Sequence, residues 1–460
     1  MCTDPPFTPY KSPTQDFGVT KPSLSPPSGS RDFLPQEALF RERVFATVKS
    51  VFTAHGYSPF ETPAFERLET LSGKYGEEGE KLIFKILKRG EKAATGEADL
   101  ALRYDLTVPT MRLYAHHRND LPRVVRRYQI GPVWRADRPG RGRFREFYQC
   151  DVDVFGSVSS LADVDVLLAL SCALEALGLK GFTIRINSRQ ALRGLMSACG
   201  VPPAKHQATL ISLDKYDKIG VDGVSAELRT SDLPHRAIKS LLNDLKANNR
   251  EAALRARIES DDEGKAGLLA ADNIASQVAP LLQGGTIRVD PILARGLDYY
   301  TGPIFEFIAD GGAESIAGGG RYDNLASLFM KESVPVCGGS LGIERIIMLL
   351  RDQVDFESSV GAVCYVTVWD EASQGDALQL VAALRAEGVS AEVDLVGGKL
   401  SRQFKVADER GCRVVIVQGP DEKAAGEVTI KEMGSGSQQR ATKANAPNVV
   451  KELVELLSQS

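Results

Sequence analysis

A chain of 460 residues is long for a single hydrophobic core, so the sequence predicts two or three domains. Its 43% hydrophobic and 25% charged residues are typical of a soluble globular protein. The net charge of −4 means that any contact with nucleic acid must come from local basic patches. No apolar run approaches the ~18 residues that span a bilayer, so no membrane partner is expected.

The cysteines and the N-terminal segment indicate a cellular compartment. The seven cysteines are scattered, odd in number and form no CxxC pair. This pattern predicts a reducing environment with neither a disulfide framework nor a zinc site. Residues 1–28 contain seven prolines and lack both the apolar core of a signal peptide and the arginines of a transit peptide. We therefore expect a disordered tail at 1–28 and a cytoplasmic location.

Between residues 29 and 189 the sequence alternates helical patterns with short strands. Asp105 is a good N-cap, because its carboxylate can accept hydrogen bonds from the free N–H groups of a first helical turn. Helices are expected at 36–55, 105–118 and 161–177, and extended segments at 57–65, 82–87, 101–103 and 183–187.

Residues 123–155 form the most informative segment. Eight arginines lie between Arg123 and Arg145, around a Pro-Gly-Arg-Gly turn. A solvated basic hairpin is one interpretation. The other is a phosphate site, because a guanidinium binds phosphate bidentately and keeps its proton. After the turn, alternation puts Phe147, Gln149, Asp151 and Asp153 on one face and Tyr148, Cys150, Val152 and Val154 on the core face. Carboxylates beside arginines suit a ligand with an ammonium and a phosphate.

The rest of the chain divides into three parts. Residues 190–285 read as an inserted helical subdomain without strand signals. Strand patterns return at 287–289 and 304–308, and 334–350 is expected to be a glycine-rich turn that enters an apolar helix. From residue 362 onward, strands and helices alternate as in a small α/β domain.

Three further motifs combine glycine with arginine, and the first two also contain tyrosine: ARGLDYYTG at 294–302, GGGRYD at 318–323 and GGSLGIER at 338–345. Ordinary strand tyrosines and flexible turns are the simpler interpretations. The functional interpretation is a backbone that passes close to a substrate, with a helix N-terminus that favours phosphate. The sequence has no P-loop and no GxGxxG fingerprint, so a nucleotide would not bind through either of these.

Taken in order, these segments resemble the histidyl-tRNA synthetases, a family of class II aminoacyl-tRNA synthetases. The resemblance begins at Gly29 and is carried by GSRDFLP, GKYGEEGEKLIFK, LRYDLTVP, REFYQCDVD, ARGLDYYTG, GGGRYDNL and LGIER. It implies an α+β catalytic domain, an antiparallel sheet flanked by helices, at 29–189 and 286–355. It also implies a helical insertion at 190–285, an α/β anticodon-binding domain at 360–460, and a homodimer.

The resemblance implies a two-step reaction. Histidine attacks the α-phosphate of ATP, which enters with Mg²⁺, to give histidyl-adenylate and pyrophosphate. The histidyl group then passes to the 3′ end of tRNA(His). The nucleophile is already a carboxylate, so no general base is expected, and no protein metal site is implied.

The resemblance also assigns roles to residues. Arg135 and Arg295 are the expected catalytic arginines at the α-phosphate. Asp137, Arg143 and Arg345 complete the expected ATP site, although Asp137 is one methylene shorter than the glutamate of the class pattern. The residues expected to bind histidine are Asp105, Thr107 and Gln149 at the α-ammonium, Asp153 and Tyr300 at the imidazole, and Tyr299 and Tyr322 nearby.

Two other functions are open at this point. One is a histidine-sensing regulatory paralogue associated with ATP phosphoribosyltransferase, which normally lacks the anticodon-binding domain and some catalytic arginines. The other is a class II synthetase for a different amino acid, against which the Asp-Tyr-Tyr segment argues.

Overall fold

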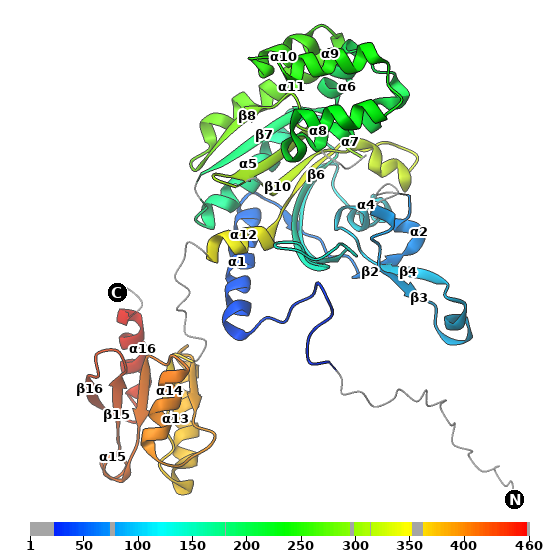
Figure 1. The fold of residues 1–460 in the computed structure, drawn as a ribbon. Coiled ribbons are helices and arrows are strands. Elements are labelled where there is room, and N and C mark those ends of the chain that lie inside the picture. Colours follow the sequence, from blue (N-terminus) through cyan, green and yellow to red (C-terminus); the bar gives the residue numbers. More distant parts are fainter. Residues whose placement is uncertain are drawn as a thin grey trace, which may run out of the picture.

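Two regions of the chain each build their own sheet in the computed structural model, which describes residues 23–73, 79–179, 181–294, 299–312, 314–351 and 362–457. Figure 1 shows the larger region, from the blue N-terminal helix to the yellow helix α12, and the smaller orange and red region. Within the described ranges, no helix is both long and apolar enough to cross a membrane.

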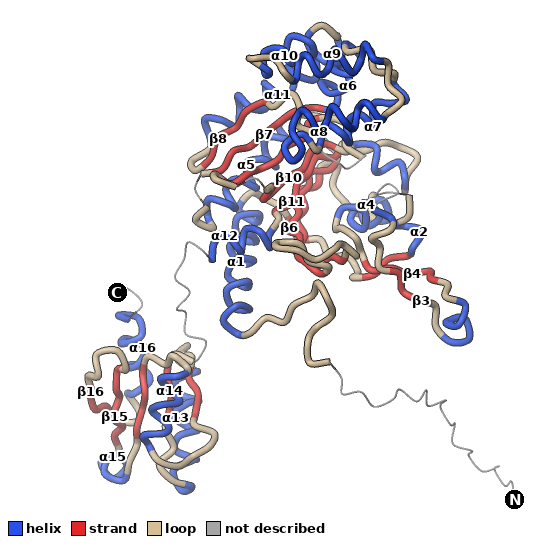
Figure 2. The backbone as a smooth tube through the Cα atoms, in the orientation of Figure 1, coloured by secondary structure: helices blue, strands red, loops and turns tan. Residues whose placement is uncertain are grey.

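An eight-stranded sheet runs through the larger region (Figure 2). Its order is β1-β5-β6-β11-β10-β9-β7-β8. The interior pairs are antiparallel, as expected, whereas the edge pairs β1–β5 and β7–β8 are parallel. The strands are β1 (Ser58–Pro59), β5 (Val125–Trp134), β6 (Glu146–Phe155), β7 (Phe182–Ser188), β8 (Gly285–Val289), β9 (Pro303–Ala309), β10 (Ser315–Arg321) and β11 (Val336–Leu341).

One face of this sheet is the hydrophobic core. Val152 and Val154 of β6 are buried there, as the alternation predicts. Helix α5 (Ser160–Ala176) packs against β6, β10 and β11, and α1 (Pro35–Ala54) packs against α5. Ser159 caps α5, because its hydroxyl accepts from the Leu161 N–H. Because α5 is buried, the helix itself carries apolar residues on nearly all of its sides.

The remaining elements of this region lie around the sheet edge. A second sheet has the order β2-β4-β3, from β2 (Phe65–Arg67), β4 (Ala98–Leu102) and β3 (Lys85–Leu87). Near it are α2 (Leu68–Leu71), the 3-10 helix η1 (Gly90–Thr95), α4 (Thr107–His116) and η4 (Asp323–Leu328), whereas α12 (Ile343–Arg351) packs against β6 and β10 of the large sheet. The strand expected at 82–87 is thus shorter than predicted.

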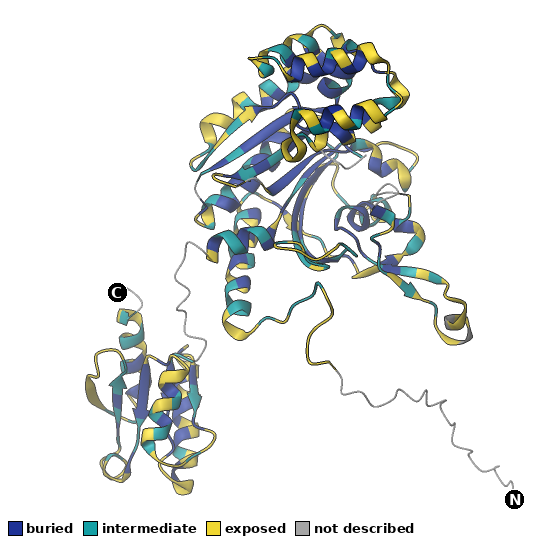
Figure 3. Ribbon diagram, viewed as in Figure 1, coloured by how far each residue is buried: buried dark blue, intermediate teal, exposed yellow. Residues whose placement is uncertain are grey.

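The inserted segment is helical, as predicted. In α9 (His235–Leu245), the spacing of Ile238, Leu241, Leu242 and Leu245 directs one face to the interior. Figure 3 shows exposed outer faces on these helices and buried central strands. The other elements are α6 (Arg189–Ala198), η2 (Pro203–Lys205), α7 (His206–Asp214), α8 (Tyr216–Thr230), α10 (Arg250–Glu259), α11 (Asp262–Val278) and η3 (Ala279–Leu281).

The glycine-rich segments are strands, so the turn expected before α12 is wrong. Gly319 in β10 and Gly339 in β11 are paired across the sheet. A Cβ at Gly339 would lie 2.7 Å from Leu170 of α5, and one at Gly319 would lie 2.7 Å from Phe305. These side chains fill the space that the glycines leave, which stabilises strands of low intrinsic propensity.

Residues 362–457 form a five-stranded sheet of order β13-β12-β14-β15-β16. The first three strands are parallel and the last two pairs are antiparallel. Val414 and Ile416 of the central strand are fully buried, as a parallel strand between helices requires. The elements are β12 (Cys364–Val366), η5 (Glu371–Ser373), α13 (Gln374–Ala386), β13 (Ala391–Val393), α14 (Leu400–Glu409), β14 (Val414–Val417), α15 (Pro420–Ala425), β15 (Glu427–Glu432), β16 (Gln438–Thr442) and α16 (Ala446–Leu457).

Candidate active site

The face of β5 and β6 opposite the core carries charged residues. Arg127 pairs across the strands with Asp153, and Gln129 pairs with Asp151. All four are at least 96% buried. The guanidinium of Arg127 forms an ion pair with the Asp153 carboxylate. A buried row of this kind needs partners, because unpaired charges in an apolar interior cost several kcal/mol.

Glycines on the neighbouring strands make room for the Asp153 carboxylate and the Tyr300 ring. Gly338 of β11 lies opposite Asp153, and a Cβ there would collide with the Asp153 carboxylate. Gly320 of β10 lies opposite Gly338, and its Cβ would come 3.0 Å from the Tyr300 ring. A side chain at either position would therefore occupy the space beside the carboxylate.

Three tyrosines gather above these glycines. The Tyr299 ring lies 5.0 Å from that of Tyr300 and 5.7 Å from that of Tyr322. The hydroxyl of Tyr322 donates to Asp153 Oδ1. Burial, with the nearby Asp153 charge, raises the pKa of Tyr322 well above its usual value, so its hydroxyl remains a donor. Asp153 thus keeps the role of acceptor.

The start of α4 contributes Asp105 and Thr107. Asp105 is buried and accepts from the Val108 N–H at 3.0 Å, so it caps the helix as predicted. Gln149 Nε2 lies 3.4 Å from Ser340 Oγ, while its Oε1 is buried without a hydrogen-bond partner among the described residues. That oxygen is a free acceptor deep in the site.

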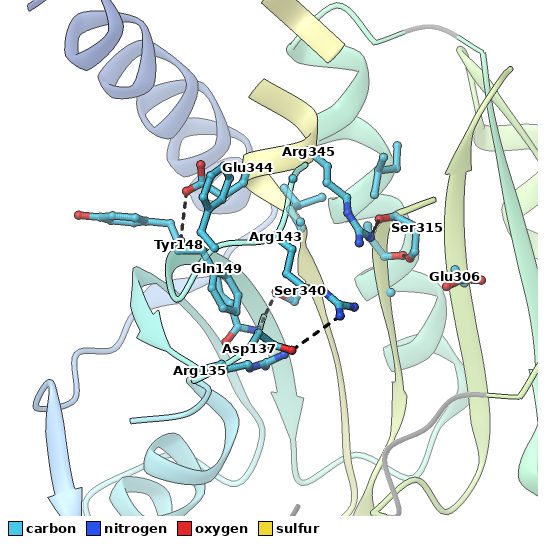
Figure 4. A pocket seen from close by; sticks show the side chains of 18 of the residues that line it. Arg135, Asp137, Arg143, Tyr148, Gln149, Glu306, Ser315, Ser340, Glu344 and Arg345 are labelled. Carbon is cyan, nitrogen blue, oxygen red and sulfur yellow. Dashed lines mark hydrogen bonds and ion pairs between the residues drawn. The ribbon is translucent and has the colours of Figure 1, made fainter. Parts of the chain in front are cut away.

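A pocket of about 420 Å³ adjoins this polar face and contains Arg135, Arg143 and Arg345. Figure 4 shows Arg135 and Arg345 on opposite sides of it, with Arg143 between them. Arg135 donates from Nε to the Tyr104 carbonyl at 3.1 Å, and its guanidinium lies 4.3 Å from the Tyr104 ring centre. These contacts fix one of the three cations before any anion binds.

At the start of α12, the Gly342 N–H and the Arg345 side chain both have partners within the chain. The Gly342 N–H donates to the Ile316 carbonyl, so it is already used. Arg345 donates to the Ser315 carbonyl at 2.6 Å and pairs with Glu314 at 3.0 Å. The sequence-based expectation of free N–H groups at this helix entry therefore fails for Gly342.

Of the two remaining residues predicted for the ATP site, Asp137 lies within the described residues and Arg295 does not. Asp137 lines the pocket and lies 3.7 Å from Arg143, an ion pair that bridges the arginine-rich turn. Arg295 lies outside the described residues. Its neighbour Ala294 lines the pocket wall.

Three residues that the sequence gave no role hold this site together. Glu344 accepts two hydrogen bonds from Arg41 of α1, at 2.7 and 2.8 Å, and one from Arg31 at 2.5 Å. Although burial raises the pKa of Glu344, the arginines hold it below the usual value. Arg31 also lies 3.5 Å from the Phe144 ring centre. The segment before α1 therefore fixes the arginine-rich turn against α12, a contact between residues too distant in sequence to predict.

Two comparisons with known proteins identify the family. A model of histidyl-tRNA synthetases matches residues 29–346, and a model of anticodon-binding domains matches residues 362–453. Histidine–tRNA ligases of Gloeobacter violaceus and Christiangramia forsetii are each 37% identical to the chain, covering 92% and 91% of it and 97% and 96% of their own lengths.

The chain belongs to the histidyl-tRNA synthetase family. Its activity is that of a histidine–tRNA ligase, an aminoacyl-tRNA synthetase. The crystal structure of histidyl-tRNA synthetase from Nostoc sp. PCC 7120 covers 94% of this chain and matches over 100% of its own length, with a TM-score of 0.77 and 28% identity. The full-length relatives and the matched anticodon-binding domain argue against the regulatory alternative.

Proposed function

We propose that histidine binds on the polar face of β5 and β6, and that ATP binds in the adjoining arginine pocket. The observation that carries this proposal is the position of Gln149. It shares the β6 face with Asp153 and also lines the pocket that contains Arg135. An amino acid that spans the two would bring its carboxylate to the α-phosphate, and such positioning lowers the entropic part of the barrier.

Recognition of histidine is assigned to two groups of residues. Asp153 accepts from one imidazole N–H, while Tyr300 donates to the other ring nitrogen, with Tyr299 and Tyr322 forming the walls. The substrate α-ammonium donates to Asp105, Thr107 and Gln149. The free Gln149 Oε1 supports this assignment, because a buried acceptor without a partner favours a ligand that supplies one.

Activation of histidine is assigned to the arginines. A carboxylate oxygen of histidine forms a bond to the α-phosphorus, the bond to the bridging oxygen breaks, and pyrophosphate leaves. Arg135 and Arg295 stabilise the charge that grows on the α-phosphate oxygens. Asp137, Arg143 and Arg345 bind the rest of the nucleotide. In the second step, a ribose hydroxyl of tRNA(His) attacks the histidyl carbonyl and releases AMP.

Mg²⁺ is proposed to enter with ATP and to neutralise phosphate charge. The residues present fit it, because Asp137 and Glu306 line the arginine pocket and carboxylates together with phosphate oxygens are preferred Mg²⁺ ligands.

A homodimer is proposed from the family resemblance, and light scattering would test it. A cytoplasmic location is supported by the six described cysteines, all free; cell fractionation would test it.

ATP–pyrophosphate exchange with each standard amino acid tests the substrate assignment. Histidine alone is expected to support rapid exchange, because a site that hydrogen-bonds both ring nitrogens rejects ligands that leave its polar groups unpaired. Exchange of similar rate with another amino acid would overturn the proposal. Aminoacylation of tRNA(His) tests the second step.

A further inference from the structure

Arg127 differs from Arg103 and Arg321, two other buried arginines of the catalytic region. Arg103 donates to the Pro132 and Thr62 carbonyls, and Arg321 donates to the Ser157 and Ser159 carbonyls and to Asp163. Those two guanidiniums are satisfied by the chain itself. Arg127 is fully buried, yet its Nε and Nη1 have no hydrogen-bond partner among the described residues. A purely structural arginine would not leave two donors unused at this depth.

Within the part of the chain that the structure describes, the ion-pair partner of Arg127 is a residue of the proposed imidazole site. Arg127 and Asp153 lie directly opposite each other on β5 and β6, and their side chains form an ion pair. Asp153 is held from its other side by the Tyr322 hydroxyl. The carboxylate is thus fixed between a cation and a donor, and it occupies the space that a side chain at position 338 would need. This arrangement orients the carboxylate toward a ligand.

Titratable groups on several elements surround Asp153. Arg127 faces it from β5, Asp151 lies beside it on β6, Tyr322 follows β10, and Cys337 lies on β11. Burial keeps Tyr322 and Cys337 protonated, because it raises the pKa of each. Burial also raises the pKa of Asp151 to about 7, and Asp151 interacts with both Arg127 and Arg103, so Arg127 is the cation that acts on Asp153.

We infer that Arg127 is a positioning residue for histidine specificity, which holds Asp153 as an ionised acceptor for the imidazole N–H. The inference rests on the proposed role of Asp153. Burial raises the pKa of Asp153, and the Arg127 charge opposes that rise. Without Arg127 the pKa of the carboxyl group would rise further, which favours the protonated form that cannot accept from an imidazole N–H. Arg127 acts through Asp153 and contacts neither ATP nor the reacting carboxylate.

The test measures the KM for histidine and for ATP by pyrophosphate exchange between pH 6 and pH 8.5. Arg127→Met is expected to raise the histidine KM about tenfold or more at pH 6. The increase should become smaller as the pH rises, because a higher pH favours the ionised carboxylate. The ATP KM and kcat should change far less. Comparison with the unmodified protein at each pH removes the titration of histidine itself.

Control variants separate positioning from stability. Arg127→Lys keeps the charge and should restore most of the histidine affinity with a flat pH profile. Arg321→Met removes an equally buried arginine that pairs with Asp163 on the opposite face, and should give no pH-dependent change in the histidine KM. If Arg127→Met does not fold, Arg127→Gln serves in its place, with the same pH dependence expected.

The outcomes distinguish a wrong role for Arg127 from a wrong role for Asp153. A histidine KM for the Arg127 variants that does not vary with pH relative to the unmodified protein would overturn the inference. Asp153→Asn tests the proposed function beneath it: an unchanged histidine KM would refute the imidazole role of Asp153. A raised KM for Asp153→Asn together with normal Arg127 variants would refute only the role of Arg127.

Discussion

The two large sheets differ in whether their buried polar groups have hydrogen-bond partners within the chain. In the C-terminal region, Asp394 accepts from the Tyr365 hydroxyl at 2.6 Å, from Arg402 at 2.6 Å and from two backbone N–H groups. Gln403, also buried, uses both its amide oxygen and its amide nitrogen. In the catalytic sheet, by contrast, Gln149 and Asp151 each keep a buried oxygen without a partner in the described chain.

This difference separates structural polarity from functional polarity. A buried group that its own chain satisfies fixes a fold, and Asp394 orders the loop between β13 and α14 in this way. A buried group left unsatisfied costs stability unless something else supplies the partner. In the catalytic sheet these groups lie on the face proposed to bind histidine. The unpaired oxygens of Gln149 and Asp151 therefore agree with the proposed position of the substrate.

The largest effect is expected from Arg135, on the functional side of the comparison. Arg135→Ala should slow histidyl-adenylate formation by about 100-fold or more, because it removes a preorganised donor from the α-phosphate. Arg138→Ala is the matched control, since Arg138 belongs to the same turn and is exposed. Rapid-quench measurement of adenylate formation checks this, and equal rates for the two variants would contradict it.

On the structural side, Asp394→Ala should destabilise residues 362–457 by about 3 kcal/mol, because it leaves a buried arginine contact and several donors unpaired. Burial raises the pKa of Asp394, but its hydrogen bonds hold it below the usual value. Its contribution is therefore present above about pH 4 and lost as the pH falls further. Hydrogen exchange of peptides from this region measures the loss. Pyrophosphate exchange should be unchanged, and a slower rate would show that the two regions are not independent.

A smaller effect of opposite sign is expected at Asp151. Burial raises its pKa to about 7, the Asp153 charge adds to the increase, and Arg127 opposes it. A carboxyl group whose pKa is raised by folding lowers the stability of the protein as the pH rises from about 4 toward 7. Asp151→Asn should therefore stabilise the catalytic region by about 2 kcal/mol at pH 8 and not at all at pH 4. Hydrogen exchange of β5 and β6 at the two pH values checks the sign; destabilisation at pH 8 would contradict it.

The sequence predicted the local features of the site but not its pairings. Alternation along β6 correctly separated Asp153 from Val152, because the two faces of a strand follow from a period of two. Arg127 received no role, because its meeting with Asp153 depends on a register that only the folded hairpin defines. The glycines of β10 and β11 read as turns, since glycine has a low strand propensity and their packing against Leu170 is invisible in sequence. Arg31 and Glu344 are in contact but lie near opposite ends of the catalytic region in the sequence, so no local pattern predicts their contact.

The strand order has a consequence for synthesis of the protein on the ribosome. β6 ends at Phe155, yet its neighbour β11 begins only at Val336, after the whole helical insertion. The carboxylate of Asp153 therefore meets Tyr322 and the strand of Gly338 only when most of the chain has emerged. Pairing across so long a separation is slow, because the loop must close before the contacts form. A nascent chain that stops before Leu341 has the arginine-rich hairpin but no complete place for an amino acid beside it.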